Sequence, residues 1–255
     1  MTALIAFDLD DTLAPSKSPM PARMGAALAA LLDVTPVCII SGGHLGQFRD
    51  QVLAHLDATD AQLSRLHLMP TCGTRYLRWS RGDWTEVYAH DLTDEERENA
   101  FAALEGEARR LGLWESQTWG EILEDRGSQI TFSALGQHAP LDKKKAWDPS
   151  GEKKERLRDA VAALLPTLEV RSGGSTSVDV TRAGVDKAYG MERLAEQTGI
   201  PVTEMLFVGD RLDPGGNDYP VVRLGMPTRP VADWEETAAF VESFVEEARR
   251  ERVRT

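Results

Sequence analysis

Acidic side chains gather directly after short apolar segments near both ends of this 255-residue chain. Asp8 and Asp10 follow the first apolar run, and Asp210 and Asp218 follow the last buried run. Two carboxylates this close repel each other and push their pKa values apart unless a cation binds between them. Carboxylate oxygens are also ligands that Mg²⁺ prefers in proteins. The spacing therefore predicts a Mg²⁺ site combined with a carboxylate nucleophile.

A hydroxyl group and flexible backbone amides follow another apolar run, at residues 34–40. Ser41 and Gly42 stand directly after it. Such groups can hold phosphate oxygens at the start of a helix. Ser41 could also serve as a helix N-cap, and one residue can fill both roles. The pattern predicts a phosphate contact here.

The apolar runs must lie on neighbouring strands if these polar groups are to meet. Each run is short and continuous, as expected for a buried parallel strand, and helical periodicity follows the runs at residues 3–8, 34–40 and 221–224. Because parallel strands present their carboxyl ends at one crevice, the acids and Ser41 should converge there. The fold prediction is an α/β, Rossmann-like doubly wound core with strands at residues 3–8, 34–40, 205–208 and 221–224 and helices at 22–32, 45–56, 187–198 and 234–250.

The middle of the chain has a different pattern, without buried parallel runs. It predicts an inserted α+β domain at residues 83–183, with residues 1–82 plus 184–255 forming the core. Residues 142–154, with lysines, Pro149 and Gly151, are the best candidate for a mobile loop. Within the insert we expect helices at 93–111 and 152–164 and extended segments at 121–135 and 167–181.

The composition excludes several partners. The chain has 41 acidic and 29 basic residues, a net charge of -12, which would repel nucleic acid and anionic lipid. No nucleic-acid or membrane partner is therefore expected. Cys38 and Cys72 are too few for a disulfide framework, so a cytoplasmic location is the default expectation.

Four motifs, in their order and spacing, resemble those of the haloacid dehalogenase superfamily of phosphotransferases. The resemblance covers nearly the whole chain. The motifs are Asp8-Leu9-Asp10-Asp11-Thr12, then Ser41, then Lys187, and finally Gly209-Asp210 with Asn217-Asp218.

The resemblance implies a role for each motif. Asp8 would be the nucleophile that forms an aspartyl-phosphate, and Asp10 would be the general acid and base. Ser41 with Gly42, and Lys187, would hold the transferring phosphoryl group. Because both the carboxylate and the phosphate are negative, a cation is needed to offset their repulsion.

The same resemblance implies a Mg²⁺ cofactor held by the acidic residues. Asp8 and the backbone carbonyl of Asp10 would bind the ion, Asp210 would be a direct ligand, and Asp218 would support the site. No other cofactor is expected.

The insert is similar in placement to the type IIB cap of that superfamily, and the likeness is strongest to the α-phosphomannomutases. Residues 172–180 read like their cap strand, and residues 214–219 match their fourth-motif loop. By resemblance, Ser177 and Asp179 would contact the substrate and Arg126 would bind phosphate. The resemblance also implies a homodimer paired through the caps.

Two departures from the mutase pattern direct the functional prediction. Ser133 and lysines stand where further arginines follow in the mutases, and Asp11 stands where they carry glycine. A lysine cannot form the bidentate contact with phosphate that an arginine makes. We therefore predict a Mg²⁺-dependent phosphatase acting on a sugar phosphate or similar small phosphorylated metabolite. The alternatives are a phosphomannomutase-like hexose phosphate mutase and a non-catalytic sugar-phosphate sensor.

Overall fold

The chain folds into two compact units in a computed structural model that describes residues 2–254 and the side chains of 2–251. One unit, here called the core unit, comprises Met1–Ala89 and Val185–Thr255, and the inserted unit comprises His90–Gly184. The sequence placed the first boundary at residue 83. The difference arises because β5 (Asp83–Ala89) pairs with β4 (Arg75–Ser80) as a hairpin of the core unit.

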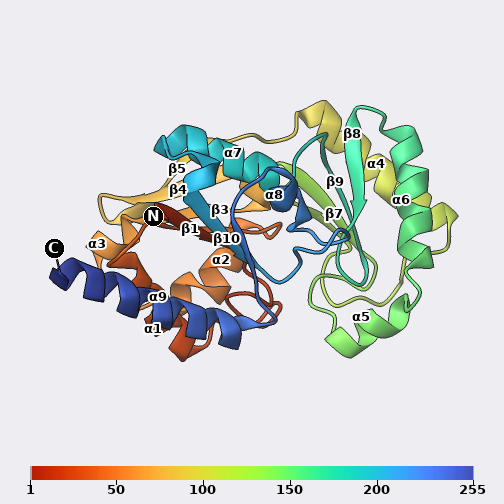
Figure 1. Cartoon of the computed structure of the whole chain (residues 1–255). Coiled ribbons are helices and arrows are strands. Elements are labelled where there is room, and N and C mark those ends of the chain that lie inside the picture. Colours follow the sequence, from red (N-terminus) through yellow and green to blue (C-terminus); the bar gives the residue numbers. More distant parts are fainter. Residues whose placement is uncertain (1, 255) are drawn as a thin grey trace. The chain divides into compact units, whose positions relative to one another are not determined.

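Seven strands of the described chain form the core sheet, in the order β11-β10-β1-β2-β3-β4-β5 (Figure 1). The first five are parallel, and β4 and β5 are antiparallel additions. The central strand β1 pairs with β10 on one side and β2 on the other, which brings the ends of the three strands to one edge. The remaining bounds are β1 (Leu4–Phe7), β2 (Val37–Ile40), β3 (Leu66–Met69), β10 (Met205–Gly209) and β11 (Thr228–Pro230).

Helices cover both faces of this sheet, which confirms the doubly wound α/β prediction. Alternate residues of β1 point to opposite cores: Ile5 packs with α1 and α9, and Leu4 packs with α7 and α8. Figure 1 shows α1 and α9 on one side of the sheet and α7 on the other. The helices are α1 (Ala22–Leu32), α2 (Leu45–Gln51), α3 (Asp60–Leu63), α7 (Lys187–Thr198), α8 (Tyr219–Arg223) and α9 (Trp234–Arg254), with 3₁₀ turns η1 (Leu53–His55), η2 (Thr71–Gly73) and η3 (Val202–Glu204).

The predicted strand at residues 221–224 is wrong, because this segment lies largely in α8. Pro220 occupies the first turn of the helix, where a missing backbone N–H costs nothing. Val221 is buried against α7, whereas Val222 is exposed. A short apolar run of this length fits either a strand or one turn of helix, so the sequence pattern alone could not decide.

The inserted unit is an antiparallel sheet with helices on one face, as expected for an α+β domain. Its strand order is β6-β7-β9-β8, and Ile130, Phe132, Val178 and Val180 form the apolar face that packs on the helices. The elements are α4 (Asp94–Arg110), β6 (Leu123–Asp125), β7 (Gln129–Ser133), α5 (Leu141–Trp147), α6 (Glu152–Leu164), β8 (Leu168–Ser172) and β9 (Ser177–Arg182).

The segment predicted as a mobile loop, residues 142–154, is instead ordered by helix formation and capping. Most of it lies in α5 and in the first turn of α6. Between the two helices, the Asp148 carboxylate accepts hydrogen bonds from the backbone amides of Lys153 and Lys154, at 3.2 and 3.0 Å. An aspartate at this position satisfies amides that a helix start leaves unpaired. Among the described residues, no helix is long and apolar enough to cross a membrane.

Candidate active site

A buried ammonium group lies between two buried carboxylates at the carboxyl edge of the core sheet. Asp8 follows β1, Lys187 is the first residue of α7, and Asp218 immediately precedes α8. The Lys187 Nζ lies 2.6 Å from Asp8 Oδ1 and 2.5 Å from Asp218 Oδ1. All three residues are at most 3% exposed. Charges buried so fully need close partners, and here each has one.

A third carboxylate completes an acidic cluster beside this ion pair. Oxygen atoms of Asp8, Asp210 and Asp218 all lie within 4.8 Å of one another. The Asp210 Oδ1 also accepts a hydrogen bond of 3.3 Å from Thr12 Oγ1, and the backbone amide of Arg211 donates to Asp218 Oδ2 at 3.1 Å. Three hard oxygen donors within this span fit the preference of Mg²⁺ for carboxylate ligands.

Burial governs the electrostatics of the cluster. Burial raises the pKa of Asp8 from 3.8 to about 7; Lys187 opposes this shift, and the neighbouring Asp218 carboxylate adds to it. Burial and the charge of Asp218 also raise the pKa of Asp210. For Lys187, burial alone would lower the pKa, but the charges of Asp8 and Asp218 reverse that effect and raise it. The lysine is therefore a permanent cation, and the carboxylates are short of positive charge.

The Asp10 carboxylate is held apart from the acidic cluster. Its Oδ1 accepts from the backbone amide of Lys17 at 2.8 Å and from Gln51 Nε2 at 3.3 Å. Its Oδ2 accepts from Gln47 Nε2 at 2.9 Å and lies 3.5 Å from Lys17 Nζ. The carboxylate is therefore free of the cluster and is surrounded by hydrogen-bond donors.

Ser41 and Gly42 lie where β2 ends, on the strand next to β1. The Ser41 Oγ accepts a 3.1 Å hydrogen bond from the backbone amide of Gly43, and Ser41 is 5% exposed. A Cβ added at Gly42 would meet only Cys72 Sγ, at 3.9 Å, which is ordinary contact. Packing therefore does not require a glycine there.

Ser177 and Asp179 share the polar face of the sheet in the inserted unit. Asp179 Oδ1 accepts a 2.7 Å hydrogen bond from Thr131 Oγ1, its partner in register on β7. A Cβ on Gly173 would lie 2.8 Å from Asp179 Oδ2 and 3.1 Å from Ser177 Oγ, so a side chain there would displace both. The structure thus groups these two predicted residues in one patch of the inserted unit.

Arg126 follows β6 and is held by a glutamate of that strand. Its guanidinium lies 2.7 Å from Glu124 Oε2, and its side chain is 9% exposed. Arg171 on β8 is held in the same way, 2.7 Å from Glu169 Oε1. The positive charge of each arginine is therefore neutralised by a glutamate two residues earlier in the sequence.

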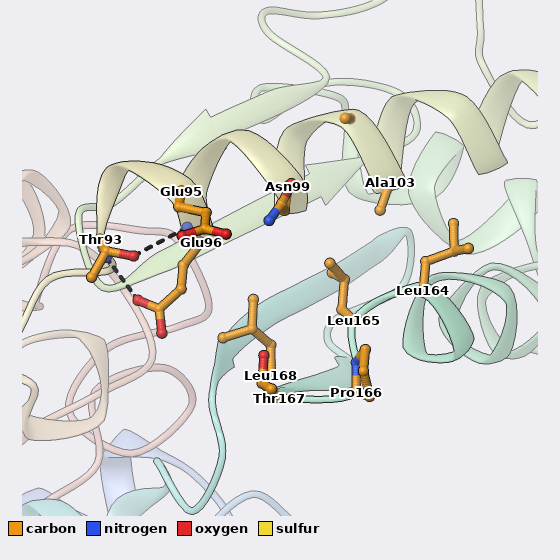
Figure 2. Close-up of a pocket in the computed structure, with 11 residues that line it drawn as sticks. Thr93, Glu95, Glu96, Asn99, Ala103, Leu164, Leu165, Pro166, Thr167 and Leu168 are labelled. Carbon is orange, nitrogen blue, oxygen red and sulfur yellow. Dashed lines mark hydrogen bonds between the residues drawn. The ribbon is translucent and has the colours of Figure 1, made fainter.

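The inserted unit also carries a pocket of about 670 Å³ that contains none of the predicted site residues. Figure 2 shows its lining: the start of α4, where Thr93 and Glu96 form a capping box, faces the turn between α6 and β8. Its walls combine Glu95 with Leu164 and Pro166. Because chemistry needs convergent polar groups, we place the candidate active site at the acidic cluster and not here.

Several residues that contact the predicted acids were not singled out from the sequence. They are Lys17, Gln47, Gln51 and, through its backbone amide, Arg211. Gln47 and Gln51 could have been recognised from the sequence, since they stand four residues apart within the apolar helical pattern after Gly43. Polar residues at that spacing share one face of a helix.

Comparisons with known proteins show which proteins the chain resembles in sequence. A family model described as "Eukaryotic phosphomannomutase" matches residues 116–233. A phosphomannomutase of Encephalitozoon cuniculi is 25% identical over 86% of this chain and 83% of its own. A phosphomannomutase of Saccharomyces cerevisiae is also 25% identical, over 86% of this chain and 84% of its own.

Solved structures show the same fold. A haloacid dehalogenase-like hydrolase from Bacteroides thetaiotaomicron has a TM-score of 0.64 at 16% identity, covering 96% of this chain and all of its own. The chain therefore has the haloacid dehalogenase fold, and its sequence is phosphomannomutase-like. Together the similarities support a phosphotransferase of the haloacid dehalogenase type.

Proposed function

We propose that the chain is a Mg²⁺-dependent phosphatase that hydrolyses a sugar phosphate, or a similar small phosphorylated metabolite, through an aspartyl-phosphate on Asp8. The observation that carries this proposal is the buried Asp8 carboxylate, 2.6 Å from Lys187 Nζ and within 4.8 Å of two further carboxylates. Burying a carboxylate beside other charged groups destabilises the folded state. A carboxylate held in such an environment is therefore a candidate functional residue.

The residues divide the reaction into two steps. In the first, Asp8 Oδ attacks phosphorus, the bond to the sugar oxygen breaks, and Asp10 gives that oxygen a proton. In the second, water attacks phosphorus, the bond to Asp8 breaks, and the water proton passes to Asp10. Lys187 offsets the negative charge on the phosphoryl oxygens throughout, with Ser41 and Gly42 donating hydrogen bonds.

The proposed Mg²⁺ site consists of Asp8, Asp210 and Asp218, with the backbone carbonyl of Asp10. When bound, Mg²⁺ supplies positive charge that reduces the repulsion between the Asp8 carboxylate and a phosphate dianion. Lys187 alone cannot do this, because its single charge is already shared by two carboxylates.

Two arginines of the inserted unit already form ion pairs with glutamates. These ion pairs favour hydrolysis over mutase activity. A mutase must hold a sugar bisphosphate in two orientations, which requires strong cationic groups for the second phosphate. Arg126 and Arg171 are each engaged by a glutamate, and Asp179 adds a negative charge to the patch. A dianionic second phosphate is therefore disfavoured there.

The second candidate is a hexose phosphate mutase, favoured by the phosphomannomutase names of the sequence relatives. A phosphate group that displaced Glu124 from Arg126 would provide the missing cation. A non-catalytic sugar-phosphate sensor is less well supported, since a sensor has no need of Asp8 and Asp10 together. Pairing of two copies through the inserted unit and a cytoplasmic location remain predictions.

One experiment separates these functions. The protein is incubated with Mg²⁺ and mannose 1-phosphate or mannose 6-phosphate, with and without a hexose 1,6-bisphosphate. Free phosphate and the isomer ratio are both measured. Phosphate release without the bisphosphate supports the phosphatase. Interconversion that depends on the bisphosphate would establish the mutase instead, and binding without either product would leave the sensor.

A further inference from the structure

We propose that Gln47 and Gln51 are positioning residues that hold the Asp10 carboxylate in its working orientation. The proposal rests on the proposed function, because Asp10 needs an orientation only if it moves protons. The proposal gives two buried glutamines on α2 a role in the reaction.

The contacts are directional and use both carboxylate oxygens. Gln47 Nε2 donates to Asp10 Oδ2 at 2.9 Å, and Gln51 Nε2 donates to Oδ1 at 3.3 Å. The Gln47 side chain is itself fixed, because its Oε1 accepts from Lys17 Nζ at 2.7 Å. The Lys17 backbone amide donates to Oδ1 at 2.8 Å. The carboxylate is thus held from two separate segments of the chain.

The position of α2 explains why these two side chains reach Asp10. The helix begins directly after the Ser41 loop and is capped by His44 Nδ1, which accepts from the Gly46 amide at 3.0 Å. Residues four apart lie on the same face, one turn above the other. Phe48 packs the helix into the core, so its rotation about its own axis is set and the glutamines face β1.

Both glutamines are buried where they contact Asp10. Gln47 is 8% exposed and Gln51 is 4% exposed. Gln51 Nε2 donates to the backbone carbonyl of Ser18 at 2.9 Å as well as to Asp10, so this residue also supports the Ser18 segment, while its Oε1 is buried without a hydrogen-bond partner among the described residues. An unsatisfied buried polar group costs about 1–3 kcal/mol. The Asp10 carboxylate is the group that both glutamines contact, and the side-chain hydrogen bonds of Gln47 go to Asp10 and Lys17.

The arrangement also fixes where the proton goes. An ionised carboxylate offers about four lone-pair sites, two on each oxygen. Oδ1 already accepts from the Lys17 amide and from Gln51, whereas Oδ2 accepts one hydrogen bond, from Gln47, and lies 3.5 Å from Lys17 Nζ. The proton is therefore received at a site on Oδ2. In the second step water oxygen bonds to phosphorus, the phosphorus–Asp8 bond breaks with its electron pair returning to Asp8, and the water proton moves to that site. Without Gln47 the carboxylate can rotate, and the site is no longer aimed at the water.

The test uses Gln47→Glu, which keeps the shape but cannot donate to Asp10 when ionised, and Gln47→Met, which is uncharged and cannot donate. Gln62→Glu is the matched control, since Gln62 lies in the capping box of α3, away from the proposed site. Steady-state kinetics and a rapid-quench measurement of phosphoenzyme are made with full-length protein and Mg²⁺. Circular dichroism and thermal unfolding check that each variant folds.

We expect both Gln47 variants to lower kcat by about 10- to 100-fold, the usual effect of a misplaced catalytic group. KM should stay within about twofold, and phosphoenzyme should accumulate because its breakdown slows. Gln51→Met should have a smaller effect, as its hydrogen bond is longer, and Gln62→Glu should match wild type.

Folded Gln47 variants with wild-type kcat would overturn the inference. So would a rise in KM with no accumulation of phosphoenzyme, which indicates a structural role. If wild type itself forms neither phosphoenzyme nor free phosphate, the proposed function fails instead, and the two failures are distinguishable.

Discussion

Replacing Lys187 by methionine tests the charge balance of the acidic cluster most directly. Methionine keeps most of the side-chain volume, so the change removes the ammonium, with its contact over the Phe207 ring, and leaves the volume of the buried side chain largely filled. The ammonium lies 2.6 Å from Asp8 and 2.5 Å from Asp218, and all three groups are buried. The variant therefore leaves two buried carboxylates without their cation.

The expected magnitude follows from this geometry. Removing one partner from a buried ion pair costs about 3–5 kcal/mol of folding free energy, because an uncompensated charge remains. Burial raises the pKa of Asp8 and Lys187 opposes that shift, so the pKa of Asp8 rises further in the variant and proton uptake relieves part of the cost as the pH falls. We therefore expect a smaller loss at pH 6 than at pH 8.

Mg²⁺ should reduce the loss. Asp8, Asp210 and Asp218 contribute three formal negative charges and Lys187 one positive charge, so one Mg²⁺ balances the wild-type cluster. The variant cluster is more negative, so it should gain more stability from Mg²⁺ than wild type does. A site that binds only in the folded state adds about 2.7 kcal/mol when the ligand is at 100 times its Kd.

The assay is urea unfolding at pH 8, in a chelator and again in saturating Mg²⁺. Lys143→Met, on an exposed part of α5, is the matched control and should change stability by less than about 0.5 kcal/mol. Adding Asp218→Asn to Lys187→Met should recover part of the loss by removing one carboxylate. A loss below about 1 kcal/mol in chelator, or a double variant that is less stable than the single one, would refute the reasoning.

Two further predictions concern other charged groups. Asp8→Asn should lower phosphate release about a thousandfold or more, since an amide is not a nucleophile, while circular dichroism shows an intact fold; normal turnover would remove Asp8 from its role. His67, buried on β3 with its Nδ1 2.7 Å from Tyr76 Oη, has its pKa lowered by burial and by Arg78 to about 4. The folded state thus binds fewer protons than the unfolded state between pH 6.5 and 4, and stability falls by up to about 3 kcal/mol as pH drops through that window. Urea unfolding of His67→Gln should show a flatter pH dependence, and an unchanged slope would contradict the assignment.

Three parallel strands of the core sheet, β1, β2 and β10, were predictable because they are short apolar runs, whereas the parallel strands β3 and β11 were not predicted. Runs such as residues 3–7 and 205–208 signal burial on both faces, and parallel strands bring their carboxyl ends together. This is why the sequence predicts Asp8, Asp210 and Ser41 at one edge of the sheet. Lys187 was predicted from its resemblance to the third superfamily motif, because a lysine at the start of a helix does not by itself indicate a buried site residue.

The antiparallel part of the core was not predictable in the same way. Both β4 and β5 carry exposed polar residues together with half-buried aromatic residues such as Trp79 and Trp84, whose rings meet edge to face across the hairpin. Such a strand depends on its cross-strand neighbours more than on its own composition. The boundary of the inserted domain was consequently set too early in the chain.

The contacts of Asp10 required the structure for a different reason. The periodicity of residues 45–56 predicts a helix but does not say which face turns toward β1. That rotation is set by the packing of Phe48 and Val52 against the core. The α5 segment was misassigned because its lysines resemble those of a loop, whereas Trp147 anchors it by donating to Glu115 at 2.9 Å.

The strong negative charge of the chain can now be reconciled with a phosphate substrate. A net charge of -12 repels anions at long range, but salt screens that repulsion beyond about 8 Å. At shorter range the acidic cluster itself repels phosphate, since Lys187 balances only one of its carboxylates. Binding of a sugar phosphate should therefore require Mg²⁺. Titration calorimetry of Asp8→Asn, which cannot turn over, should show binding of mannose 6-phosphate in Mg²⁺ and at least about tenfold weaker binding in chelator; equal affinities would mean that Lys187 alone neutralises the site.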